Sequence, residues 1–142
     1  MIYLFVRDSF NPLHCGHLAY FKAAKQLSST LIVIVNNDIQ VWIKGGGTCF
    51  DLDSRMEIVS AIKYVNMVVP SIDQDYSVSN TLESLLKDKP EDLKVCFVNS
   101  GDRNLMSSNE KEVAICDLYG INMEYLSLPK IDSSSRIRSL RH

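Results

Sequence analysis

The sequence has little excess charge of either sign, because fifteen Lys and Arg residues stand against seventeen Asp and Glu residues. This balance produces no extended basic field that could hold nucleic acid or an anionic membrane surface. We therefore expect neither nucleic acid nor membrane as a partner. An anion could bind only at a local site.

Long apolar runs are also missing, and none approaches the roughly 18 residues that a membrane span requires. The first residues, MIYLFV, are typical of a short strand and lack the charged and apolar regions of a signal peptide. A chain of 142 residues is long enough for one substantial core. The sequence therefore predicts a soluble, cytoplasmic protein with a single domain, residues 1–142.

Paired cysteines are absent: the four cysteines, at positions 15, 49, 96 and 116, form no Cys-x-x-Cys motif. This pattern is typical of reduced thiols in a cytosolic protein, and Cys15 is expected to be a small filler residue rather than a nucleophile. Only three histidines occur, and no third histidine or acidic residue has the spacing that a zinc site requires. We predict no protein-bound metal site.

Short apolar runs alternate with helical periodicities along the chain. The expected strands cover residues 2–6, 31–35, 65–69, 95–98 and 123–126, and the expected helices cover 17–27, 53–63, 76–86 and 110–119. In the first helix, Leu18, Phe21, Ala24 and Leu27 recur on one face, which predicts that they are buried. Residues 39–50 are predicted to be a mobile loop, because three consecutive glycines interrupt the pattern.

The remaining signals concern helix ends and fold class. Asp53 and Ser54 are expected to cap the second helix, and a last short helix could begin within the serines at 133–135. The alternation predicts an α/β fold: a single-domain, Rossmann-like, doubly wound parallel sheet of about five strands with helices on both faces. In such a sheet, ligands bind beyond the carboxyl ends of the strands, where helices begin.

The stretch SFNPLHCGHL, residues 9–18, places two of the three histidines at that position. His14 and His17 share a face of the first helical turn, and Gly16 allows a ligand to approach the main chain between them. Their imidazoles can donate hydrogen bonds to phosphate oxygens. A lone histidine at a helix start is more often a cap, but a pair around a glycine favours an anion site.

These residues resemble a known family. SFNPLHCGHL is similar to the signature of the HxGH nucleotidyltransferases. The segments SRMEIVSAIKYVNMVVPS (54–71) and NSGDR (99–103) resemble the glycerol-3-phosphate cytidylyltransferase branch of that superfamily. The run SSSRIR at 133–138 resembles its late motif, in which hydroxyls and a helix start bind a triphosphate. The resemblance covers nearly the whole chain.

The resemblance implies transfer of a nucleoside monophosphate, with CMP favoured, from a nucleoside triphosphate to a small phosphorylated acceptor, with release of pyrophosphate. Glycerol 3-phosphate, a phosphocholine-type compound or a sugar phosphate would be the acceptor, and Mg²⁺ would accompany the triphosphate. Relatives often form dimers, so a homodimer is left open. The implied catalytic residues are His14, His17, Lys44 and Lys130. The implied nucleotide-binding residues are Ser9, Phe10, Gly16, Gly101, Asp102, Arg103, Ser133, Ser134 and Ser135.

One departure from the resembled family concerns Asp8, which stands where the family has glycine. A carboxylate close to a triphosphate repels it, unless Asp8 points away or helps to hold a magnesium ion.

Two other functions stay open. One is an adenylyltransferase that uses ATP with a sugar phosphate, pantetheine phosphate or nicotinamide mononucleotide. The other is a nucleotide-binding module without turnover.

Overall fold

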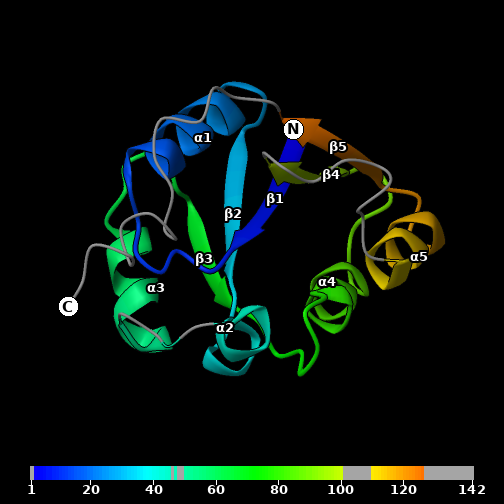
Figure 1. Ribbon diagram of the computed structural model, residues 1–142. Helices are drawn as coiled ribbons and strands as arrows, with labels where there is room; N and C mark the ends of the chain where they lie inside the picture. The colour runs from blue at the N-terminus through cyan, green and yellow to red at the C-terminus, as the bar shows by residue number, and fades with distance from the viewer. Residues whose placement is uncertain (1, 46, 48–49, 101–109, 127–142) are drawn as a thin grey trace.

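The computed structural model describes residues 2–45, 47, 50–100 and 110–126 (Figure 1). Within them, one five-stranded sheet has the order β3-β2-β1-β4-β5, and every neighbouring pair is parallel. The expected α/β, Rossmann-like sheet is therefore confirmed. The elements are β1 (Ile2–Asp8), α1 (Cys15–Gln26), β2 (Thr30–Val35), α2 (Asp38–Lys44), α3 (Leu52–Ser60), β3 (Met67–Pro70), α4 (Ser79–Leu86), β4 (Lys94–Ser100), α5 (Glu110–Leu118) and β5 (Asn122–Leu126).

The two faces of the sheet carry separate apolar cores, because successive side chains of a strand point to opposite faces. Leu4 and Val6 of β1 pack with Tyr20 and Phe21 of α1 on one face, which α3 also covers. Phe5 packs on the other face with residues of α4 and α5. Figure 1 shows the two helix pairs on opposite sides of the strands. This arrangement confirms helices on both faces.

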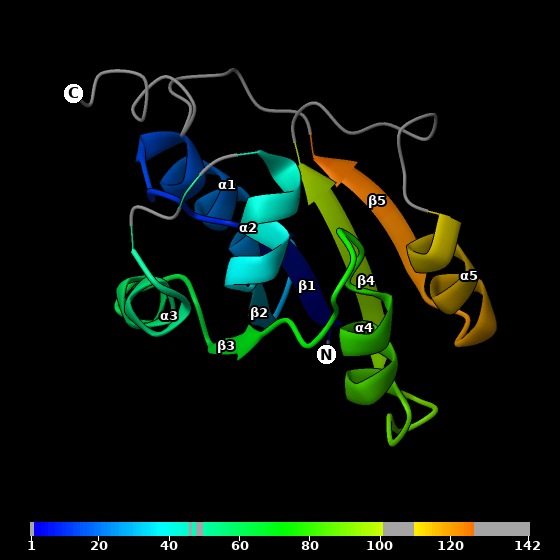
Figure 2. The ribbon, with the colours of Figure 1, turned by 60° about the horizontal axis from the view of Figure 1, so that its bottom comes forward.

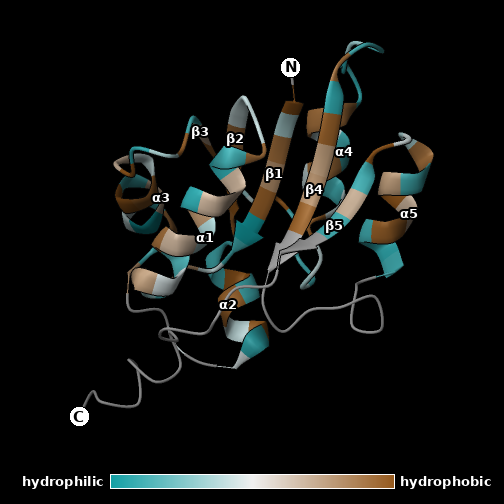
Figure 3. Cartoon of the chain, turned by 90° about the horizontal axis from the view of Figure 1, so that it is seen from above, coloured by the Kyte–Doolittle hydropathy of each residue, from teal (hydrophilic) through white to brown (hydrophobic). Residues whose placement is uncertain are grey.

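The strand order reverses between β1 and β4, since β2 and β3 lie on one side of β1 while β4 and β5 lie on the other. In doubly wound sheets the ligand crevice lies at this reversal, outside the carboxyl ends of the strands. In Figure 3, β1 is brown along most of its length and teal at its carboxyl end, where Arg7 and Asp8 lie. Polar side chains therefore begin where the crevice is expected.

The prediction of a loop at 39–50 is wrong for its first part, because residues Asp38–Lys44 form the short helix α2 (Figure 2). Asn37 and Gln40 form a reciprocal capping box at its start, and Gly45 ends it with φ 99°, a conformation that glycine adopts without strain. Of its apolar residues, Val41 is buried, whereas Trp42 is 67% exposed. With its apolar side chains divided between core and solvent, the segment shows no clear helical stripe.

The buried face of α1 also differs from the expected one. Phe21 and Ala24 are buried as predicted, but Leu18 and Leu27 are exposed, and Leu27 is the C-cap residue rather than part of the helix. His17 and Tyr20 take the buried positions instead. The core therefore accepts a histidine where the pattern predicted a leucine.

Two smaller differences concern helix ends and cysteines. The cap of α3 is Asp51, whose side chain accepts the Ser54 N–H, rather than Asp53 and Ser54. Cys15 is exposed and therefore does not fill a gap in the core. None of the helices in the described ranges has the length and hydropathy of a membrane span.

Candidate active site

The site starts at the carboxyl end of β1, where the chain turns sharply into α1. Phe10 lies in this turn with φ 52°, a left-handed conformation that is uncommon for a bulky residue. Its ring is buried and packs against the His17 ring in a T-shaped arrangement, with centroids 4.8 Å apart. The turn therefore fixes both the start of α1 and the orientation of His17.

His14 is the N-cap of α1. Its Nδ1 accepts the backbone N–H of Gly16 at 3.0 Å, and its backbone carbonyl accepts the N–H of His17. Since Nδ1 is an acceptor, the proton of the neutral ring lies on Nε2. His14 therefore already accepts backbone N–H groups that the helix start was expected to offer to a ligand, those of Gly16 and His17.

His17 completes the cap from the third helical position. Its Nδ1 accepts the backbone N–H of His14 at 3.1 Å, so the two histidines form a reciprocal capping box. The two rings stack with centroids 3.9 Å apart. By the same reasoning as for His14, the neutral His17 ring carries its proton on Nε2. Both imidazoles thus hold the helix start with one nitrogen and have the other as a donor.

Asp8, the last residue of β1, faces this pair. Its Oδ2 lies 3.5 Å from Nε2 of His17, and its Oδ1 accepts the Ser9 N–H at 2.6 Å. Burial raises the pKa of the Asp8 carboxyl, but the hydrogen bond from His17, the charge of Lys44 and the hydrogen bond from the Ser9 N–H together outweigh it. The pKa therefore lies well below its usual range. The carboxylate points toward the histidines rather than away from them.

Lys44 reaches the same region from the end of α2. Its Nζ lies 5.8 Å from the centroid of the Tyr76 ring, and its charge acts on Asp8. Arg7 stacks on the same ring, with Cζ 4.8 Å from the centroid. Tyr76, which the sequence patterns did not single out, therefore lies in cation–π contact with cations of two elements. No local motif in the sequence signals this role.

Arg55 of α3 holds together the loops around the site, and the sequence patterns did not predict this role. Its guanidinium is buried and donates to the carbonyls of Ser9, Asn36 and Phe50 at 2.7, 2.6 and 3.0 Å. It also pairs with the carboxylate of Asp38 at 2.6 Å. It therefore ties the carboxyl ends of β1 and β2 to the starts of α2 and α3. The only sequence signal for it is its place in the segment 54–71.

The predicted nucleotide-binding residues near β1 have internal partners in the structure. Ser9 is buried, its Oγ accepts from Nδ2 of Asn36, and its N–H bonds Asp8. Phe10 packs against His17, and Gly16 donates to His14. These residues therefore shape the site; their contacts with a nucleotide stay a prediction.

The described structure brings together His14, His17 and Lys44 of the predicted catalytic residues. The remaining predicted residues lie outside the described ranges: Lys130, Gly101, Asp102, Arg103, Ser133, Ser134 and Ser135. The expected final helix near the three serines also lies outside them.

Within the described ranges, neither a metal cluster nor a reactive thiol contributes to the site. No set of three His, Cys, Asp or Glu side chains there is arranged to hold a metal ion. Burial raises the pKa values of the Cys96 and Cys116 thiols to about 12, so neither is a thiolate nucleophile at neutral pH. The chemistry of the described site therefore rests on imidazole, ammonium and carboxylate groups.

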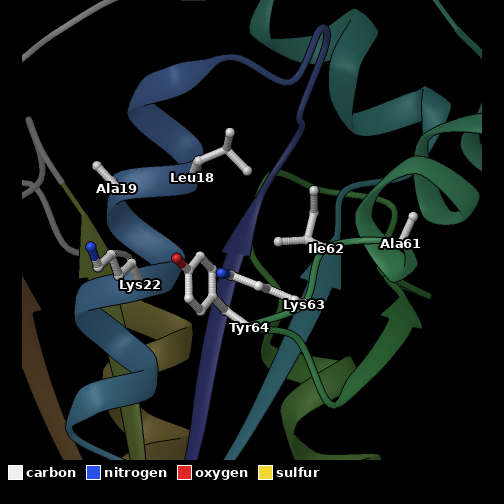
Figure 4. A pocket seen from close by; sticks show the side chains of 7 residues that line it. All are labelled: Leu18, Ala19, Lys22, Ala61, Ile62, Lys63 and Tyr64. Carbon is white, nitrogen blue, oxygen red and sulfur yellow. The ribbon is translucent and has the colours of Figure 1, made fainter.

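A separate groove of about 470 Å³ lies between α1 and the segment that joins α3 to β3 (Figure 4). Leu18 and Ile62 extend toward one another from its two walls, and Lys22 and Lys63 also line it. It shares no lining residue with the histidine site. The groove is therefore distinct from the candidate active site.

A parallel sheet with a strand-order reversal, and a helix start built from two imidazoles beside it, define the class of doubly wound nucleotide-binding folds. The family model described as cytidylyltransferase-like matches residues 8–140. The chain therefore belongs to this family of nucleotidyltransferases.

Individual relatives agree with this membership. The FAD synthase of Thermoplasma volcanium is 25% identical over 142 residues, which is 97% of this chain and 92% of the relative. The bifunctional protein HldE of Shewanella denitrificans is 34% identical over 109 residues, 73% of this chain. That match spans only 22% of HldE, so this chain corresponds to a part of that protein.

Solved structures share the fold. The lipopolysaccharide core biosynthesis protein from Thermoplasma volcanium superposes with a TM-score of 0.68 and 24% identity, covering 93% of this chain and 99% of that one. Thermotoga maritima TmcAL bound with alpha-thio ATP superposes with a TM-score of 0.65 and 15% identity, covering 99% and 50% respectively. At these identities the likeness establishes the fold alone.

Proposed function

We propose that this protein is a nucleotidyltransferase that moves AMP from ATP to the phosphate of a small acceptor and releases pyrophosphate. The observation that carries the proposal is the stacked imidazole pair at the carboxyl end of β1, beside the strand-order reversal. Both rings hold Nδ1 in the helix cap and carry the Nε2 proton as a donor. Hydrogen-bond donors fixed in this way suit developing phosphoryl charge.

In the proposed reaction, a phosphate oxygen of the acceptor attacks the α-phosphorus of ATP. A new P–O bond forms, the bond from the α-phosphorus to the bridging oxygen breaks, and its electron pair leaves with pyrophosphate. The nucleophile is already anionic, so no base has to remove a proton. Catalysis therefore consists mainly of positioning and charge stabilisation.

Different residues of this chain position the substrates and stabilise the charge. His14 and His17 donate from Nε2 to oxygens around the α-phosphorus, and the Lys44 ammonium at the end of α2 attracts the phosphates. Arg55 and Phe10 act indirectly, because they hold the turn from which the histidines project. The predicted triphosphate and base contacts at 101–103, 130 and 133–135 belong to the same proposal.

Magnesium would neutralise part of the triphosphate charge. In this proposal the ion arrives bound to the triphosphate.

The choice of ATP rests on relatives. FAD synthase, a relative that matches over 97% of this chain and 92% of its own length, is named for a product that contains an adenine nucleotide. TmcAL, which has the same fold, is described with an ATP analogue bound. These names favour adenylyl transfer over the cytidylyl transfer that the sequence resemblance favoured. Cytidylyl transfer remains the second candidate, supported by the likeness of residues 54–71 to cytidylyltransferases.

The test is pyrophosphate release with each of ATP, CTP, GTP and UTP, combined with FMN, glycerol 3-phosphate, phosphocholine, sugar phosphates, pantetheine phosphate and nicotinamide mononucleotide. We expect release with ATP and one acceptor class. Release with CTP alone would replace adenylyl by cytidylyl transfer. Tight triphosphate binding without release from any pair would instead identify a binding module.

A further inference from the structure

Side chains along β1 alternate between the two faces of the sheet, and this alternation directs the Asp8 side chain toward the site. Leu4 and Val6 point into the core beneath α1, and a residue two positions after Val6 points to the same side. The Asp8 side chain therefore leaves the strand at its carboxyl end, on the side where α1 begins. It is 28% exposed, so it lies at the surface of the site rather than within the core.

Asp8 contacts Nε2 of His17, the ring nitrogen that takes no part in the helix cap. Nδ1 of His17 accepts the His14 N–H, and Nε2 faces Oδ2 of Asp8 at 3.5 Å. Both ring nitrogens of His17 therefore face groups of the protein itself. A phosphate oxygen that approaches Nε2 meets a carboxylate already there.

Asp8 also remains charged when the protein is at neutral pH. Burial raises the pKa of its carboxyl, but His17, Lys44 and the Ser9 N–H together hold it well below the usual range. Protonation thus cannot remove the carboxylate from His17 under ordinary conditions. The carboxylate leaves His17 only when a ligand displaces it or when Asp8 is substituted.

We propose that Asp8 is an internal anion that competes with the triphosphate for the Nε2 donor of His17 and for the charge of Lys44. This inference rests on the proposed function, because it assigns the same site to a triphosphate. A triphosphate binds by displacing the carboxylate, and Asp8 thereby sets the affinity of the site for anions. Asp8 is a specificity-determining residue and takes no part in the transfer itself.

The experiment compares four proteins: the wild type, Asp8→Asn, Asp8→Gly and Asp88→Asn. The first substitution removes the charge at nearly constant shape, and the second also removes the side chain. Asp88→Asn makes the same change of net charge in the turn that leads from α4 to the amino end of β4, whereas Asp8 lies at the carboxyl end of β1. Binding of ATP with Mg²⁺, without acceptor, is measured by titration calorimetry and by the fluorescence of Trp42, the single tryptophan.

We expect both Asp8 variants to bind ATP tighter by on the order of tenfold, because no carboxylate then has to be displaced from His17 and Lys44 before the phosphates bind. Asp88→Asn should bind as the wild type does. In ¹⁵N spectra of the imidazoles, the His17 Nε2 signal should shift on Asp8→Gly substitution and shift likewise when ATP saturates the wild type. In turnover assays, Asp8→Asn should lower KM for the triphosphate.

Unchanged or weaker ATP binding by folded Asp8→Asn and Asp8→Gly would overturn the inference. If these proteins still release pyrophosphate in that case, the proposed function stands and only the inference about Asp8 fails. Tighter binding by both variants, with no release by any protein, would support the inference and overturn the enzymatic function. Failure of all four proteins to bind ATP would overturn both.

Discussion

The rings of His14 and His17 stack with centroids 3.9 Å apart, and each accepts through Nδ1 a backbone N–H at the start of α1, from Gly16 and His14 respectively. The groups proposed to bind phosphate are thus also the groups that start the helix. A simple truncation of either histidine removes a cap and a donor at once. Each can be tested only with a variant that keeps the cap.

His14→Ala should lower the free energy of unfolding by about 1 kcal/mol, because the N-cap acceptor is lost. His14→Asn should restore that stability, since asparagine is a strong N-cap residue, but should leave turnover reduced by on the order of 100-fold. Urea denaturation and pyrophosphate release measure the two effects. Full turnover in His14→Asn would mean that the imidazole does not act on the phosphates.

His17 sits at the third helical position, where glutamine commonly completes a capping box. His17→Gln should therefore keep helix α1 closer to wild-type stability than His17→Ala does. Both variants should lose on the order of 100-fold in kcat, because the imidazole donor is absent. Circular dichroism melts and kcat are the measurements. Wild-type kcat in His17→Gln would contradict the proposed phosphate contact.

Lys44 is exposed, so its removal should affect activity more than folding. We expect Lys44→Gln to lower kcat/KM for the triphosphate about tenfold or more, with an unchanged melting temperature. The matched control is Lys87→Gln, which changes an exposed lysine at the end of α4, just before the turn that leads to the amino end of β4. Equal kcat/KM values for the two variants would mean that Lys44 does not act in the site.

Arg55→Lys should destabilise the fold by about 3 kcal/mol, because one ammonium cannot reach the three carbonyls and the carboxylate that the guanidinium holds. The loss should appear in urea denaturation at pH 7. Lys63→Arg, on the same side of the sheet but in the exposed turn after α3, should leave stability near that of the wild type. A fully stable Arg55→Lys protein would contradict the assigned role of the guanidinium.

The low pKa of Asp8 links stability to pH. The folded-state pKa lies below the ordinary 3.8, so the carboxylate stabilises the folded protein above about pH 4, and this contribution is lost as the pH falls further. Asp8→Asn lacks the contribution at every pH. Denaturation of both proteins at pH 7, 5 and 3 should give a difference that is largest at pH 7 and shrinks at pH 3. A difference that grows toward low pH would contradict the direction of the shift.

Local patterns predicted every strand of the described sheet to within a few residues, because buried parallel strands are short, continuous apolar runs. They missed α2, whose start depends on a capping box between Asn37 and Gln40 and on Gln40 reaching the carbonyls of Asp75 and Ser77. Those carbonyls lie about 35 residues away along the chain. Periodicity within one segment contains no information about such partners.

The sequence by itself determined the alternation of elements and the place of the histidine pair after the first strand, since both depend on neighbours along the chain. Only the tertiary structure decided that Asp8 faces His17, that Tyr76 lies in cation–π contact with Arg7 and Lys44, and that Arg55 joins the ends of two strands. These contacts form between elements that meet only when the sheet assembles. Their partners are fixed by strand order and packing, which no single stretch of sequence contains.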